Sequence, residues 1–181
     1  MIFHPQNIAG VKLIELNPYV DPRGSLTRFF CQQQLLDKQI SFDVKQCNLS
    51  VNKERLTLRG FHYQKEPFSE QKILSCVRGK IYNVVVDLRR NSNTYLQHQV
   101  FNLDATAANC LYLPAGCANA FLTLEKESHI FYWHSAFFNP DTYAGFRYDD
   151  PYFGIIWPDR PAAISDKDLG YPDFRIDESQ L

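Results

Sequence analysis

The sequence predicts an all-β domain in the form of a sandwich or barrel of short strands. Short apolar segments follow one another at roughly regular spacing, and residues typical of turns separate them. Aromatic residues, which favour strands, make up 14% of the chain. No repeat, low-complexity tract or linker divides the 181 residues, so we expect a single domain over residues 1–181.

The N-terminal part contains two expected strands and one expected helix. Residues 11–16 form an apolar run typical of a strand, and the loop that follows contains prolines and Gly24. Extended structure is expected again over residues 25–30. Residues 31–40 are rich in Gln, Leu and Lys and carry leucines at helical spacing, so a short helix is predicted there.

The centre of the chain is a series of expected strands, at residues 44–51, 58–64, 72–77 and 80–88. The last two flank Arg78-Gly79, and this pattern predicts a hairpin. Within the 80–88 segment, one face is expected to carry Tyr82, Val84, Val86 and Leu88, and the other Ile81, Val85 and Asp87.

Four further strands are expected, at residues 97–103, 110–113, 120–124 and 129–138. The chain beyond them is irregular and rich in proline, which disfavours strands and helices. A short helix is predicted at residues 166–169.

Composition and charge exclude several classes of protein. Hydrophobic residues make up 45% and charged residues 22% of the chain, with a formal net charge of -1. This composition describes a globular protein and disfavours a nucleic-acid partner. The five cysteines form no CxxC pair, so they predict neither a disulfide framework nor a structural zinc site. With no apolar segment long enough for a membrane, we expect a soluble cytoplasmic protein.

The segment Leu58-Arg59-Gly60-Phe61-His62-Tyr63-Gln64 is the centre of the functional hypothesis. Strand alternation places Gly60 and His62 on one face and Arg59 on the other. Histidine suits proton transfer, because an unperturbed imidazole titrates near pH ~6.5. Taken alone, His62 is better explained as a core residue that hydrogen-bonds a carbonyl group, so the functional hypothesis depends on the rest of the chain.

Several short motifs occur along the chain in a distinctive order. They are Asp21-Pro22-Arg23-Gly24, Gln46-Cys47-Asn48, Leu58 to Gln64, Gln71-Lys72-Ile73-Leu74, Arg78-Gly79, Val86-Asp87-Leu88-Arg89, Leu113-Pro114-Ala115-Gly116, Tyr132, Trp157-Pro158 and Ser165-Asp166-Lys167-Asp168. In these motifs the chain resembles the dTDP-4-dehydrorhamnose 3,5-epimerase family over almost its whole length.

The resemblance implies a cupin-type jelly roll, or double-stranded β-helix, with a few short peripheral helices. It also implies a homodimer in which strands cross between subunits. The expected substrate is a dTDP-linked 4-keto-6-deoxyhexose, and neither a metal nor an organic cofactor is expected.

The family's reaction, in deoxysugar (rhamnose-type) biosynthesis, inverts C3 and C5 next to the C4 ketone of the sugar. A base removes a proton to give an enolate, and an acid returns a proton on the opposite face. Carried over by position, His62 is the base and Asp168 is its orienting carboxylate. Lys72 stabilises the enolate, and Tyr132 is the acid.

The same resemblance assigns the substrate-binding residues. Arg23 would contact the nucleotide diphosphate, and Arg59 the sugar or the diphosphate, because guanidinium groups pair well with phosphate oxygens. Gln46 and Asn48 would line the sugar and nucleotide pocket. Asn119 stands where the family usually carries a pocket histidine, and it cannot titrate near neutrality.

Other departures from the family pattern concern the nucleotide end of the site. Arg28 replaces a common glutamate, Leu26 a common aromatic residue, and Phe137-Phe138 a usual tyrosine pair. These changes leave two alternatives open. One is a 3- or 5-epimerase of another deoxysugar pathway, and the other is a nucleotide-sugar-binding paralogue with weakened catalysis.

A metal-dependent cupin enzyme is a further alternative. Such a site would need closely spaced histidines and carboxylates as ligands. The five histidines form no HxH pair, so the sequence disfavours this class.

Overall fold

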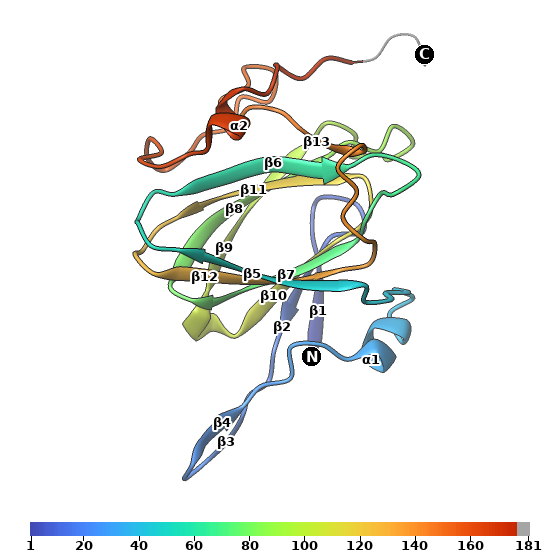
Figure 1. The fold of residues 1–181 in the computed structure, drawn as a ribbon. Coiled ribbons are helices and arrows are strands. Elements are labelled where there is room, and N and C mark those ends of the chain that lie inside the picture. The colour runs from blue at the N-terminus through green and yellow to red at the C-terminus, as the bar shows by residue number, and fades with distance from the viewer. Residues whose placement is uncertain (177–181) are drawn as a thin grey trace.

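The computed structural model describes residues 1–176 as two facing antiparallel sheets (Figure 1). The six-stranded sheet has the order β1 (Ile2–Pro5), β2 (Lys12–Glu15), β10 (Asn109–Leu113), β7 (Lys72–Arg78), β12 (Ser128–His134) and β5 (Gln46–Asn52). The five-stranded sheet has the order β13 (Tyr143–Gly145), β6 (Leu58–Gln64), β11 (Cys117–Thr123), β8 (Lys80–Asp87) and β9 (His98–Asp104). Strands from distant parts of the chain thus interleave in each sheet, and this arrangement confirms the predicted jelly roll.

Helices are short and lie outside the two sheets. They are α1 (Gln32–Leu36), the 3₁₀ turn η1 (Ala105–Ala107) and α2 (Asp166–Leu169). The first is shorter than the predicted helix, because Gln39 adopts a left-handed backbone with φ 61° and the chain turns there. Neither α-helix of residues 1–176 is long and apolar enough to cross a membrane.

Three apolar clusters hold the layers together. The first lies between the sheets and includes Leu74, Val85 and Leu111. The second covers the outer face of the six-stranded sheet with the segment around α1, and the third covers the five-stranded sheet with the C-terminal segment. Strand β8 contributes Val85 to the first cluster and Val84 and Val86 to the third, so it is buried on both faces.

The predicted hairpin at Arg78-Gly79 is wrong. Strand β7 pairs with β10 and β12, whereas β8 pairs with β11 and β9, so the turn carries the chain from one sheet to the other. Gly79 has φ 74°, and a Cβ there would lie 2.5 Å from Ser128 Oγ. The sequence signal marks a tight turn correctly, but it does not say which strands pair across it.

A two-stranded hairpin, β3 (Tyr19–Asp21) and β4 (Gly24–Leu26), stands away from the sandwich (Figure 1). Its apolar side chains are largely exposed, at 72% for Val20 and 75% for Leu26. An isolated hairpin of this kind is only marginally stable in water.

Candidate active site

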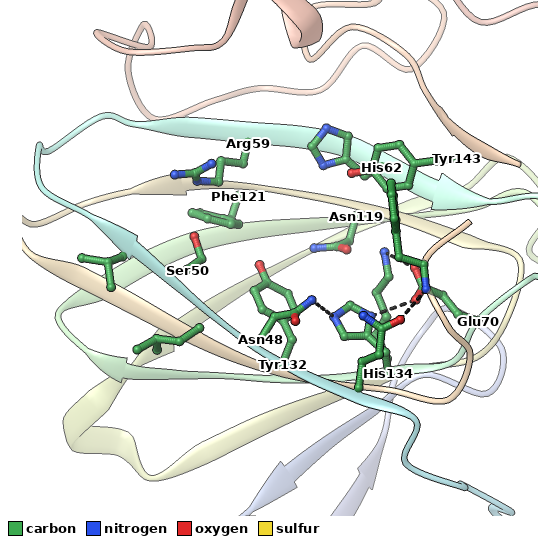
Figure 2. Close-up of a pocket in the computed structure, with 15 residues that line it drawn as sticks. Asn48, Ser50, Arg59, His62, Glu70, Asn119, Phe121, Tyr132, His134 and Tyr143 are labelled. Carbon is green, nitrogen blue, oxygen red and sulfur yellow. Dashed lines mark hydrogen bonds and ion pairs between the residues drawn. The ribbon is translucent and has the colours of Figure 1, made fainter. Parts of the chain in front are cut away.

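A cavity of about 630 Å³ lies between the two sheets, with β6 and β11 on one wall and β5 and β12 on the other (Figure 2). Most of the predicted site residues line it: Gln46, Asn48, Arg59, His62, Lys72, Asn119 and Tyr132. A volume of this size suits a small organic ligand. The fold therefore brings together side chains that are far apart in the sequence.

His62 and Asp168 form a hydrogen-bonded pair at this cavity. The Nε2 atom of His62 lies 2.7 Å from Oδ1 of Asp168. The other carboxylate oxygen, Oδ2, accepts the Gly60 N–H at 3.1 Å, and Ser165 Oγ accepts the Asp168 N–H at 3.1 Å. The carboxylate is therefore fixed at the start of α2, and Nδ1 is the ring nitrogen of His62 that does not contact it.

Asp168 is ionised in this arrangement. Burial alone would raise its pKa, but the hydrogen bond and charge of His62 outweigh burial, and the Gly60 N–H adds to their effect, so that the pKa lies below its usual value. An anionic Asp168 accepts the Nε2–H of His62 and holds the imidazole in one tautomer.

A β-bulge places Arg59 on the same side as His62, contrary to the prediction from alternation. Strand β6 pairs Arg59 with Phe121 and His62 with Asn119, so it has one more residue than β11 between these positions. Gly60 allows this irregularity with φ 112°, in close contact with Ala120. Both Arg59 and His62 consequently line the cavity.

Lys72 reaches the cavity from β7 as part of a buried charge network. Its Nζ lies 3.1 Å from Oε1 of Glu70, and Oε2 of Glu70 lies 2.8 Å from Nδ1 of His134. The side chains of Lys72 and Glu70 are each 7% exposed, and that of His134 is 14% exposed. Asn48 Nδ2 completes the chain, 3.4 Å from Nε2 of His134.

Glu70 is the anion of this network. Burial raises its pKa, but the hydrogen bond from His134 and the charge of Lys72 outweigh burial, so the pKa lies below its ordinary value. The sequence analysis missed Glu70 and His134. One signal was available for His134: it follows Tyr132 by two residues on a strand, so the two side chains share a face.

Tyr132 projects from β12 into the cavity, on the wall opposite His62 (Figure 2). Its ring stacks on that of His134, with centroids 5.7 Å apart. Burial raises the pKa of Tyr132, although the nearby cation of Arg59 acts in the other direction. The hydroxyl is therefore protonated at neutral pH, as a proton donor requires.

Asn119 lies directly beside His62, because the two residues are paired across β11 and β6. Its Nδ2 donates to Oδ1 of Asn83 at 3.2 Å, which orients the amide in the cavity wall. Gln46 accepts a hydrogen bond from the backbone N–H of Phe138, and both of these residues line the cavity. Phe137 is 63% exposed and lies outside the cavity lining.

Tyr143 is another cavity residue that the sequence analysis missed. Its ring centroid lies 5.3 Å from that of His62, and Nζ of Lys167 lies 4.5 Å from the ring. Burial, followed by the charges of neighbours including Asp168, raises the pKa of Tyr143. A neutral phenol therefore borders the proposed base.

Arg23 is the predicted site residue that lies far from the cavity of its own chain. It lies at the turn of the β3–β4 hairpin, where its side chain is 88% exposed and pairs with Asp21 at 2.6 Å. Arg28 is also exposed and does not line the cavity. Within residues 1–176, no three His, Cys, Asp or Glu side chains are grouped so as to hold a metal ion.

A jelly roll with a histidine–carboxylate pair, a lysine and a phenol around one cavity defines an acid–base enzyme of the cupin type. The sequence pattern of the dTDP-4-dehydrorhamnose 3,5-epimerases matches residues 5–175. The chain belongs to this family of sugar isomerases.

Individual relatives support the same assignment. A dTDP-4-dehydrorhamnose 3,5-epimerase of Sinorhizobium fredii is 34% identical over 173 residues, which cover 95% of this chain and 89% of the relative. The crystal structure of dTDP-4-dehydrorhamnose 3,5-epimerase from Bacillus anthracis, with TDP and PPi bound, superposes with a TM-score of 0.92 at 31% identity. That match covers 96% of this chain and 99% of the other.

A third relative differs in activity. ChmJ, a 3'-monoepimerase from Streptomyces bikiniensis whose structure contains dTDP-quinovose, superposes with a TM-score of 0.87 at 33% identity. The match covers 94% of this chain and 86% of ChmJ. The family resemblance therefore extends to a relative that acts at a single carbon.

Proposed function

We propose that this protein inverts C3 and C5 of a dTDP-4-keto-6-deoxyhexose in deoxysugar biosynthesis. The observation that carries the proposal is the His62–Asp168 pair facing Tyr132 across one cavity. An epimerase must remove a proton on one face of the sugar and return a proton on the other. Groups on opposite walls of a cavity meet this requirement.

The ketone at C4 makes the hydrogens on C3 and C5 acidic. His62 takes one of these protons on Nδ1, while Asp168 stabilises the resulting imidazolium through Nε2–H. The electrons of the broken C–H bond form the enolate. Tyr132 then delivers a proton to the opposite face of the same carbon, and the ketone re-forms with that centre inverted.

Lys72 is the cation that stabilises the enolate oxygen. One of its three N–H groups is directed at Glu70, which leaves the others for a ligand in the cavity. A preorganised donor of this kind is worth about 3 kcal/mol of transition-state stabilisation.

Substrate binding is assigned to the remaining polar residues of the cavity. Arg59 donates from Nε to Oδ1 of Asn52 at 2.7 Å, so its position is fixed while its terminal nitrogens are left for a sugar or phosphate oxygen. Gln46, Asn48 and Asn119 supply amide groups along the walls.

We also propose a homodimer in which the β3–β4 hairpin of one subunit carries Arg23 to the partner's cavity. The exposed Val20 and Leu26 support this proposal, because they need an apolar surface to cover them. Light scattering would measure the mass in solution.

A complementation experiment tests the shared site. The Arg23→Ala and His62→Ala proteins are each expected to have reduced epimerase activity. Once their subunits exchange, about a quarter of the sites regain both residues if the two residues of each site come from different chains. The absence of any recovery in a verified heterodimer would refute the shared site.

The decisive test of the proposed activity is incubation with dTDP-4-keto-6-deoxyglucose in D₂O, with C3 and C5 followed by NMR. Deuterium entry with inversion at both carbons, lost in His62→Ala, would support the 3,5-epimerase. Inversion at C3 alone would assign the activity of ChmJ instead. Binding without any exchange would refute the catalytic assignment and leave a nucleotide-sugar-binding protein.

The five unpaired cysteines support a cytoplasmic location, because reduced thiols are typical of that compartment. We also propose that residues 1–181 form one domain, of which residues 177–181 lie outside the part of the chain that the structure describes. In support, the C-terminal segment packs on the five-stranded sheet through Phe146, Phe153 and Phe174.

A further inference from the structure

The cavity contains a second histidine–carboxylate pair, formed by His134 and Glu70. The Nδ1–Oε2 distance of 2.8 Å is close to the 2.7 Å of the His62–Asp168 pair. His62 lies on β6 of the five-stranded sheet, and His134 lies on β12 of the six-stranded sheet. The two imidazoles therefore face the cavity from opposite walls (Figure 2).

The contacts of His134 fix the roles of its two ring nitrogens. Glu70 is anionic and can only accept a hydrogen bond, so Nδ1 of His134 carries a proton. The exchangeable position is then Nε2, next to Asn48. The amide of Asn48 can meet both states, because its NH₂ donates to a bare Nε2 and its carbonyl oxygen accepts from Nε2–H.

His134 is held in place by other side chains that line the cavity. Glu70 is shared with Lys72, and the Tyr132 ring stacks on the imidazole. Asn119, which lies beside His62, cannot supply a proton near neutrality. His134 is thus the second imidazole of the cavity lining, on the wall where the proton must be returned.

We propose that His134, oriented by Glu70, is a second proton donor to the face of the sugar opposite His62. It acts beside Tyr132, which lies two residues away on the same strand. The inference rests on the proposed epimerase function and adds a residue to its mechanism.

The proton transfers in this step balance. His62 Nδ1 takes the proton from carbon, and the electrons of that bond form the enolate. His134 Nε2–H gives its proton to the opposite face of the same carbon, and the enolate electrons form the new C–H bond. His62 then holds one extra proton and His134 lacks one, and exchange with water resets both.

The test compares deuterium entry with inversion in His134→Gln, using dTDP-4-keto-6-deoxyglucose in D₂O. In this variant Tyr132 is the remaining donor on the opposite wall, and at any carbon that depends on His134 the base His62 still removes a proton and returns deuterium to the same face. We expect exchange at wild-type rates within a few fold, while inversion at C3, C5 or both falls roughly 10²-fold or more. His129→Gln is the matched control, because His129 lies on the same strand but not in the cavity lining.

Three results would overturn the inference or its basis. Unchanged inversion in His134→Gln, equal to that of His129→Gln, would show that His134 donates no proton. Equal loss of exchange and inversion in a folded variant that still binds dTDP would assign His134 to the support of Lys72 instead. A wild-type protein that neither exchanges nor inverts would refute the proposed function itself.

Glu70→Gln tests the positioning role of the carboxylate. The glutamine oxygen can still accept from Nδ1 of His134, but the negative charge 2.8 Å from the ring is removed. We expect the kcat for inversion to fall at least 10-fold with KM changed less than threefold, while exchange persists. Equal effects on exchange and inversion would contradict a role specific to proton return.

Discussion

Replacement of Asp168 by asparagine is the sharpest test of the proposed base. Oδ2 of Asp168 accepts the Gly60 N–H, and this contact keeps the carbonyl oxygen of an asparagine in place. The NH₂ group of the asparagine would then face Nε2 of His62, which must become an acceptor. The imidazole proton would move to Nδ1, the atom that has to accept the substrate proton.

The size of the effect follows from this change of tautomer. Loss of a positioned general base reduces the rate roughly 10²–10⁴-fold, which corresponds to about 3–5 kcal/mol in the activation free energy. Deuterium exchange and inversion should fall together, because both begin with proton removal. The contact with Gly60 is kept, so dTDP binding should be unchanged.

The assay is NMR-detected exchange at C3 and C5, with dTDP affinity measured by calorimetry. Asp166→Asn is the matched control, because Asp166 lies on the same short helix and is exposed. Asp168→Asn activity within threefold of the control would refute the assignment of His62 and Asp168 as base and orienting group.

Three further predictions concern the buried charges and the bulge. Lys72→Met should reduce kcat/KM about 10²–10³-fold and lower the unfolding free energy by up to about 3 kcal/mol. Adding Glu70→Gln to this variant should recover stability but not activity. Urea titration would measure the stability, and kinetics would measure the activity. Glu70 and Asp168 have lowered pKa values in the folded state, so the stability they contribute is present above the unfolded values near ~4 and is lost as the pH falls through the folded values. The melting temperature should therefore drop as the pH falls below about 5, and less steeply in Glu70→Gln. Equal slopes for the two proteins would contradict this account. Gly60→Ala should lower the unfolding free energy by about 1–3 kcal/mol, because the new Cβ would lie 2.7 Å from Ala120 and the backbone φ is 112°. An unchanged melting temperature in calorimetry would count against the bulge geometry.

Most strands of the two sheets and seven of the fifteen cavity-lining residues could be predicted from sequence, whereas β1, β3 and β13 were not predicted. Residues 58–64 form a strand with the predicted bounds, and His62 and Asp168 are in contact although 106 positions separate them. The motif pattern supplied this pairing, because spacing alone cannot show which distant residues meet. Tyr132 and Lys72, which the same motif pattern predicted to be site residues, also line the cavity.

Other features depended on pairing and burial, which a linear pattern does not contain. Strand alternation predicted that Arg59 and His62 point to opposite faces, whereas the bulge opposite β11 places both side chains in the cavity lining. The Arg78-Gly79 turn was recognised, but only the sheet order shows that it joins two layers.

The sequence by itself determined the all-β class and the family, because these depend on local residue chemistry and on motif order, and it predicted the acid–base groups around His62. Only the tertiary structure decided that Glu70 lies between Lys72 and His134, and that His134 faces the cavity opposite His62. The physical reason is that a charge network is defined by distances of about 3 Å between side chains from different parts of the chain, and those distances exist only after β7 and β12 have paired within the six-stranded sheet.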